Sequence, residues 1–244
     1  YVRDLLPAVL APLVGVAAAL VIIVLILGWQ GADPLVAWDF LYQGTLADAV
    51  KRADLVSYWM PLAITSLGLV LTYTAGLWNI GVEGQVVMGA IGGTWAIRLF
   101  AEGHGPFGVE AVGRTPLIIL SFIFAAIAGG LWALLVAVLK TRGGVNEIFG
   151  GGALNFIAQT FNMYLISNGG PWQPVGSRAT ETARFPAIAQ LPTFAEFRRL
   201  SPIPIYIVIG AFILIALIMY VSRWGLQLRA MGKNMRSAFL LGVR

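Results

Sequence analysis

Long apolar runs separated by short polar segments dominate this chain, and they predict its secondary structure. A membrane-spanning helix needs about 20 predominantly apolar residues, and most of the runs approach that length. The expected helices cover residues 9–27, 60–77, 86–100, 117–139, 148–166 and 203–221. We therefore predict an all-α integral membrane protein with about six transmembrane helices.

The third run is too short to cross a bilayer as a helix. Its residues, 86–100, would cover about 22 Å at 1.5 Å per residue, against a hydrocarbon core of about 30 Å. A polar segment with three glycines precedes it, at residues 76–85. Within a membrane, such a non-helical segment is tolerated only where its backbone packs against protein or lines a cavity. We predict a broken helix near residues 76–85, formed by Asn79, Gly81, Glu83, Gly84 and Gln85, with Glu83 bracing free backbone amides.

Composition supports a membrane protein and excludes several kinds of site. The chain is 59% hydrophobic and 11% charged, and its mean hydropathy is +0.83. It has no cysteine, so disulfides and thiolate metal sites are excluded, and the lone His104 has no nearby ligand partners. The net charge of +5 does not indicate a nucleic-acid partner, because the basic residues do not cluster with stacking aromatics. We expect no metal and no cofactor on this chain.

The distribution of charge indicates how the chain is oriented. Six spans would leave both chain ends on one side of the membrane, and the last 22 residues hold five basic residues and no acid. Basic residues near span ends favour the cytoplasm, so we place this side there. The long segments at 28–58 and 168–202 then lie outside, and the prolines of the second predict a loop with short helical pieces.

Small and polar residues recur at helical spacing within the spans. Three pairs have the four-residue spacing that is typical of close helix contact in lipid, namely Gly89/Gly93, Ala125/Gly129 and Ala126/Gly130. Three amides at i, i+4 and i+7 share one helical face in the run 148–166. This stripe either bonds neighbouring helices or lines a path for a polar solute, and both interpretations stay open. The candidate pathway residues are Asn155, Gln159, Asn162 and Phe156.

The tail alternates basic and apolar residues directly after the last span. We expect a short amphipathic helix near residues 228–242, which lies on the lipid surface or docks into a groove on a soluble partner. Its candidate docking residues are Arg229, Gly232, Lys233, Asn234, Ala238 and Gly242. Asn234 follows Gly232-Lys233 where a phosphate-binding loop needs Ser or Thr, so we do not expect this chain to hydrolyse ATP. The spans also lack any acid–base arrangement that would indicate an enzyme.

Three motifs resemble those of one transport family. Residues 76–85 are similar to its G-L-F-N-I-G-x-E-G-Q, and residues 144–147 with 154–157 resemble its G-V-N-E and L-N-Y-I. Residues 228–242 resemble L-R-A-V-G-x-N-P-x-A-A-x-x-x-G, except that Met235, Arg236 and Ser237 replace the expected Pro, acidic residue and Ala. The chain thus resembles permease subunits of bacterial nucleoside and simple-sugar ABC importers, within the branched-chain amino acid/ribose permease family.

The resemblance implies half of an import pathway for a nucleoside or related small polar solute, in the bacterial cytoplasmic (inner) membrane. A second permease subunit would complete the pathway, two cytoplasmic ATPase subunits would bind ATP and Mg, and an extracytoplasmic lipoprotein would deliver solute. The tail would be a cytoplasmic coupling helix. Because three of its residues differ from the family motif, the resemblance does not identify the particular ATPase that it would bind. We expect residues 1–244 to be a single transmembrane permease domain, incomplete at both ends. The alternative is an ion-coupled secondary transporter, against which the basic tail and the lack of an inverted repeat count.

Overall fold

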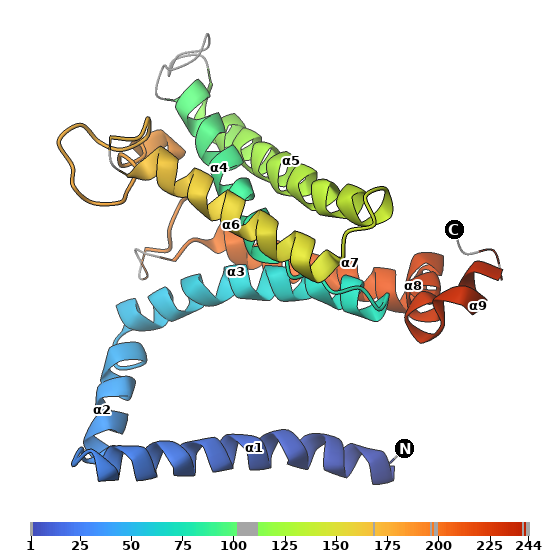
Figure 1. Ribbon diagram of the computed structural model, residues 1–244. Coiled ribbons are helices and arrows are strands. Elements are labelled where there is room, and N and C mark those ends of the chain that lie inside the picture. The colour runs from blue at the N-terminus through green and yellow to red at the C-terminus, as the bar shows by residue number, and fades with distance from the viewer. Residues whose placement is uncertain are drawn as a thin grey trace. The chain divides into compact units, whose positions relative to one another are not determined.

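The computed structural model describes residues 2–101, 112–167, 169–195, 197, 200–240 and 242, and the regular elements in these ranges are all helical (Figure 1). His104 lies outside the described residues. The helices are α1 (Val2–Trp29), α2 (Pro34–Thr45), α3 (Ala49–Thr74), α4 (Val82–Phe100), α5 (Arg114–Thr141), α6 (Glu147–Ile166), a 3₁₀ turn (Ala187–Ala189), α7 (Pro202–Val221), α8 (Arg223–Lys233) and α9 (Met235–Leu240).

The chain divides into two compact units. The first comprises residues 1–58 and 194–200, with α1, α2 and the beginning of α3. The second comprises residues 59–193 and 201–244, with the rest of α3 and all the later helices. The predicted break, amide stripe and tail all belong to the second unit.

Four helices in the described residues are long and apolar enough to cross a membrane. They are Leu10–Trp29, Ala49–Thr74, Arg114–Thr141 and Pro202–Val221. The runs 86–100 and 148–166 do form helices, α4 and α6, but neither combines the length and hydropathy of the other four. The all-α multi-pass membrane fold is therefore confirmed, whereas the expected number of about six spans is not.

The first unit contains a helix in the segment 28–58, for which the sequence predicted a position outside the membrane but no secondary structure. Residues 28–58 include α2 and the first turns of α3, which begins 11 residues before the predicted start at residue 60. The Asp33 side chain accepts a hydrogen bond from the Leu35 amide at 2.8 Å, and Pro34 occupies the first turn. An N-cap followed by proline is a strong helix-start signal, so the start of α2 could have been predicted from the sequence.

In the second unit, α4 packs along both α5 and α6, as Figure 1 shows. The α4–α5 contact is close because glycines face the partner backbone. A Cβ on Gly93 would lie 3.3 Å from the Ser121 carbonyl oxygen, and one on Gly129 would lie 3.0 Å from that of Gln85. The small-residue spacing thus predicted close helix packing correctly at Gly93 and Gly129, as is common where helices associate in lipid. For the pair Ala126/Gly130 it did not, because a Cβ on Gly130 would meet nothing within 4 Å.

The proline-rich segment is a loop as far as it is described. Between α6 and α7 the only regular element in the described residues is the 3₁₀ turn Ala187–Ala189. Phe185 and Ile188 of this loop pack on a small core of Ile97, Ala101 and Leu117. The loop therefore covers the adjacent ends of α4 and α5 with apolar side chains.

The tail forms two helices rather than the single one expected near 228–242. Asn234 leaves helical geometry at φ −159° and ψ 100°, which ends α8. Its side chain then accepts a hydrogen bond from the Ser237 amide at 3.0 Å, as an N-cap residue does, and α9 follows. The split is thus caused by a capping asparagine within the tail.

Candidate functional site

The helix break is shorter than predicted and has a defined geometry. α3 ends at Thr74, and Gly76 adopts a left-handed φ of +76°. The Leu77 amide bonds the Thr72 carbonyl at 2.9 Å and the Gly76 amide bonds the Tyr73 carbonyl at 3.0 Å, which is a Schellman motif. α4 begins at Val82, so residues 82–85 of the predicted break form its first turn and bring it to 19 residues.

Asn155 of α6 holds the two sides of this break together. Its Nδ2 donates to the Ile80 carbonyl at 2.9 Å, and its Oδ1 accepts from the Gly84 amide at 2.8 Å. Gly84 is the third residue of α4, where an N-cap side chain normally satisfies the free amide. The N-cap residue here is Gly81, which has no side chain, so Asn155 performs the capping from a neighbouring helix.

Glu83 is joined to the same helix, one turn further along. The Gln159 Nε2 donates to the Glu83 Oε1 at 2.9 Å. A carboxylate in the first turn of α4 also interacts favourably with the positive end of the helix dipole. Glu83 therefore bonds a side chain of the amide stripe, and not the free backbone amides that the sequence suggested.

Two further amides of the break bond each other. The Gln85 Nε2 donates to the Asn79 Oδ1 at 3.1 Å, and the Asn79 Nδ2 lies 3.5 Å from the Gln85 Oε1. This reciprocal pair joins the irregular segment to the first turn of α4. It leaves each carboxamide with one N–H and one acceptor position unused among the described residues.

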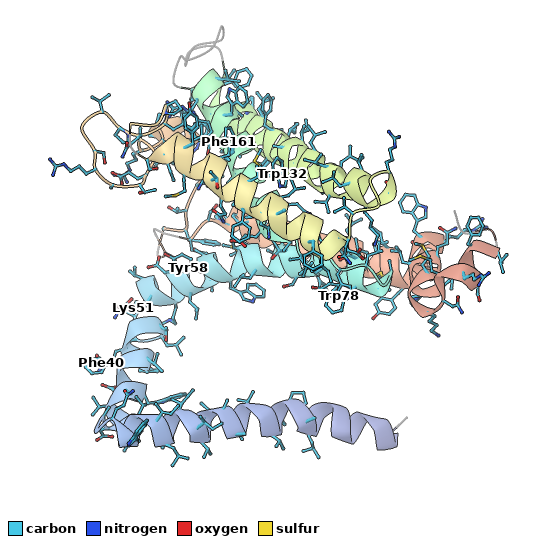
Figure 2. The ribbon with its side chains drawn as sticks, viewed as in Figure 1. Phe40, Lys51, Tyr58, Trp78, Trp132 and Phe161 are labelled. Carbon is cyan, nitrogen blue, oxygen red and sulfur yellow. The ribbon has the colours of Figure 1, made fainter. Side chains whose placement is uncertain are left out.

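Close backbone contacts require glycine on both sides of the break. A Cβ on Gly151 of α6 would lie 2.7 Å from the Gly81 nitrogen. A Cβ on Gly84 would lie 2.8 Å from the Trp132 Nε1 and 2.9 Å from the Asn155 Oδ1. The Trp132 N–H is buried and has no hydrogen-bond partner in the described part of the chain (Figure 2). α4, α5 and α6 thus meet at the break without room for larger residues.

The ends of α5 and α6 are joined by an ion pair, and its carboxylate also contacts the backbone of the break at Trp78. The Lys140 Nζ donates to the Glu147 Oε1 at 2.6 Å, just before the predicted span 148–166. This bond lowers the pKa of the Glu147 carboxyl, with smaller contributions from its own backbone amide and from that of Trp78. The Trp78 ring, labelled in Figure 2, packs on Tyr73 with centroids 5.5 Å apart.

The tail reaches the other end of the break. A Cβ on Gly232 of α8 would overlap the Thr74 carbonyl oxygen at the end of α3. A Cβ on Gly76 would in turn lie 3.5 Å from the Gly232 Cα. Residue spacing did not indicate that the predicted docking residue Gly232 contacts the end of α3 before the predicted break. The contact requires glycine at position 232, whereas at position 76 the left-handed φ of +76° is what favours glycine.

The remaining tail candidates do not gather into one site. Arg229 is half-buried, Lys233 and Asn234 are exposed, and Ala238 of α9 is buried. Gly242 adopts a φ of +87° beyond the end of α9. The docking role of these residues stays a prediction.

The amide stripe of α6 separates into two parts. Asn155 and Gln159 are bonded to the break, as described above. Asn162 is half-buried without a hydrogen-bond partner in the described ranges, and Phe156 is 78% exposed. The hydrogen bonds of Asn155 and Gln159 support the interpretation that the stripe bonds a neighbouring helix. That Asn155, Gln159, Asn162 and Phe156 line a solute path stays a prediction.

These features define a multi-pass helical membrane protein built around an interrupted helix that a neighbouring helix holds in place. The chain belongs to the branched-chain amino acid transport system / permease component family, which matches residues 52–244. The matched region includes the break, the stripe and the tail. The family description is that of a permease component of a transport system.

The chain is similar to several curated permeases. It is 32% identical to the glucose ABC transporter permease protein TsgB13 of Haloferax volcanii, over 99% of this chain and 63% of that protein. It is 27% identical to the guanosine ABC transporter permease protein NupP of Bacillus subtilis, over 98% of this chain and 64% of that protein. The nucleoside ABC transporter permease protein NupC of Lactococcus lactis is 28% identical over 78% of this chain and 58% of its own length.

The chain thus spans somewhat less than two thirds of the length of these relatives. No solved structure matches it significantly.

Proposed function

We propose that this protein is the permease subunit of an ATP-driven importer and forms half of the translocation pathway for a nucleoside or related small polar solute. The observation that carries the proposal is the family match over residues 52–244, which contains all three motifs that the sequence singled out. The names of the similar permeases support the solute class, since they specify glucose, guanosine and nucleosides. These solutes are uncharged and rich in hydrogen-bonding groups.

The proposed assembly contains a second permease subunit, two cytoplasmic ATPase subunits that bind ATP and Mg, and an extracytoplasmic substrate-binding lipoprotein. It lies in a bacterial cytoplasmic membrane, with α4 and α6 completing six spans of a single permease domain. The basic tail supports a cytoplasmic C-terminal side, because it holds five basic residues and no acid in its last 22 residues.

In this proposal α8 and α9 form the coupling element that docks on the ATPase. Arg229 and Lys233 supply positive charge for an acidic groove, and Gly232 lies against the end of α3. A displacement of α8 by the ATPase would therefore act directly on Thr74 and on the break that follows it. The break is in turn bonded to α6, so the contact supplies a continuous route from the tail to the amide stripe.

The experiment is reconstitution of the full-length protein with its partner subunits and measurement of ATP hydrolysis. The binding protein is supplied with a panel of nucleosides, nucleobases and pentoses. The proposal expects hydrolysis to rise when the binding protein carries a nucleoside or a related neutral solute. Hydrolysis that no neutral solute stimulates would contradict the proposed solute class.

A further inference from the structure

A groove of about 430 Å³ lies on the α3 side of the helix break, within the second unit. Small-molecule sites commonly have volumes of about 300–1,000 Å³, so the groove is large enough for a solute of this class. It is lined by α3, the break, the first turn of α4 and one residue of α5, and no α6 residue contributes. Its polar residues are Thr65, Thr72, Asn79 and Gln85.

We propose that this groove is where the transported solute contacts the permease, with the Asn79–Gln85 amide pair as its recognition element. The inference rests on the proposed function and makes it more specific. It assigns solute contact to the α3 side of the break, and it gives Asn155 and Gln159 of α6 a positioning role on the break itself.

The hydrogen-bonding groups of the groove suit an uncharged polar solute. After their mutual bonds, Asn79 and Gln85 each keep one N–H and one acceptor position. The Thr65 hydroxyl donates to the Pro61 carbonyl at 2.9 Å, and that of Thr72 donates to the Leu69 carbonyl at 3.0 Å. With their hydrogens engaged, both hydroxyl oxygens are available as acceptors. The groove therefore offers donors and acceptors that match sugar hydroxyls or a nucleobase edge.

The lining has no charged side chain, and this restricts the solute class. A phosphate or carboxylate entering a mostly apolar groove loses hydration and needs a cationic or multiple-donor partner. The two carboxamides and two acceptor hydroxyls of the groove do not provide such a cationic or multiple-donor partner. The groove is thus expected to accept a nucleoside and to reject the corresponding nucleotide.

The amide pair is not needed to satisfy the backbone of the break. The Schellman bonds satisfy the end of α3, and Asn155 satisfies Ile80 and Gly84. Asn79 and Gln85 bond only each other through their side chains in the described part of the chain. A pair of amides with unused donors and acceptors beside a groove is the arrangement that a polar binding site requires.

Gly68 of α3 gives direct experimental access to the groove. It lines the groove, and a Cβ placed there would meet nothing within 4 Å, so a side chain at this position enters empty space. Gly130 of α5 also has nothing within 4 Å of its Cβ position but does not line the groove. Because residues 1–244 contain no cysteine, a thiol introduced at either position is the only one in this part of the protein.

The test measures thiol labelling of Gly68→Cys and Gly130→Cys in the reconstituted complex of the full-length protein, with guanosine, glucose or guanosine monophosphate as probes. We expect a neutral probe that the complex imports to slow labelling of Gly68→Cys about ten-fold when it is present at ten times its Kd, because few sites then stay empty. Labelling of Gly130→Cys should not change, and guanosine monophosphate should protect neither thiol. Equal labelling of Gly68→Cys with and without an imported probe would overturn the inference.

Three variants, of which Gly130→Leu is the control, complete the test with uptake kinetics. Gly68→Leu should abolish uptake while Gly130→Leu retains it, and Asn79→Ala should raise the KM for uptake about ten-fold, as expected for lost neutral hydrogen bonds. Normal uptake by Gly68→Leu would exclude the groove as the solute site and leave the proposed importer intact. If the unmodified complex shows no ATP-dependent uptake of any neutral probe, the proposed function itself fails.

Discussion

The Asn155 side chain of α6 accepts a hydrogen bond from the Gly84 amide at 2.8 Å and donates one to the Ile80 carbonyl at 2.9 Å. One carboxamide thereby satisfies a donor in the first turn of α4 and an acceptor in the irregular segment before it. A helix interruption leaves such backbone groups free, and in lipid each unsatisfied group costs several kcal/mol. Asn155 is therefore the residue on which the geometry of the break most depends.

Replacing Asn155 with Leu should destabilise the protein, because the Gly84 amide then loses its partner. We expect a loss of about 1–3 kcal/mol in the free energy of unfolding, together with reduced uptake. Thermal unfolding of the purified protein in detergent measures the first effect. Asn162→Leu is the matched control on the same helix and should leave stability unchanged, since Asn162 has no partner among the described residues. A stable Asn155→Leu variant that fails in uptake would instead indicate direct solute contact.

Substitution of Gly232 with Ala should uncouple ATP hydrolysis from transport. The added methyl would overlap the Thr74 carbonyl oxygen, so α8 must move away from the end of α3. We expect basal ATPase activity to persist and its stimulation by the loaded binding protein to disappear. Gly210→Ala in α7 is the control, because its Cβ meets nothing within 4 Å. Full stimulation in Gly232→Ala would show that the α8–α3 contact does not transmit movement.

Reversal of charge at Arg229 tests the docking role of the tail separately. Arg229→Glu places a negative charge on α8, which otherwise carries only basic charges. We expect the ATPase subunits to be lost when the complex is purified, while the permease still inserts into the membrane. Arg229→Lys keeps the charge and should retain most of the ATPase. If Arg229→Glu co-purifies with as much ATPase as the unmodified permease does, Arg229 is not part of the docking surface.

Acid should weaken the ion pair between Lys140 and Glu147 that joins the ends of α5 and α6. The hydrogen bond from Lys140 holds the pKa of Glu147 below its ordinary value of 4.5. A lowered carboxyl pKa contributes stability above the unfolded-state value, and that stability is lost as pH falls through the folded-state value. The thermal midpoint of the protein should therefore fall below about pH 4.5, and Glu147→Gln should lessen that fall. An unchanged acid profile in Glu147→Gln would contradict this role.

The sequence predicted the helices and the interruption, but not the contacts that hold the interruption in place. Three glycines and several polar side chains between apolar runs are a local signal, and they located the break to within a few residues. Pairing of Asn155 with Gly84 depends on how α6 lies along α4, which residue spacing within one helix does not determine. The same holds for Gly232 and Thr74, which are far apart in the chain.

Two helix starts were missed although their capping signals were present in the sequence. Asp33-Pro34 marks the start of α2, in a segment for which no helix was predicted. Asn234 with Ser237 marks the start of α9, within a tail that was predicted as one helix. In both cases a capping residue was more informative than the average polarity of the segment.

The central claim of ATP-driven import is tested most directly by solute uptake into proteoliposomes that contain the full-length protein with its second permease, ATPase and binding-protein partners. Radiolabelled guanosine, cytidine, ribose and glucose are offered on the binding-protein side. We predict that at least one neutral solute accumulates when ATP is present on the ATPase side, and that neither a non-hydrolysable analogue nor an ion gradient replaces ATP. Uptake that proceeds without ATP and stops when ionophores remove the ion gradients would contradict the account.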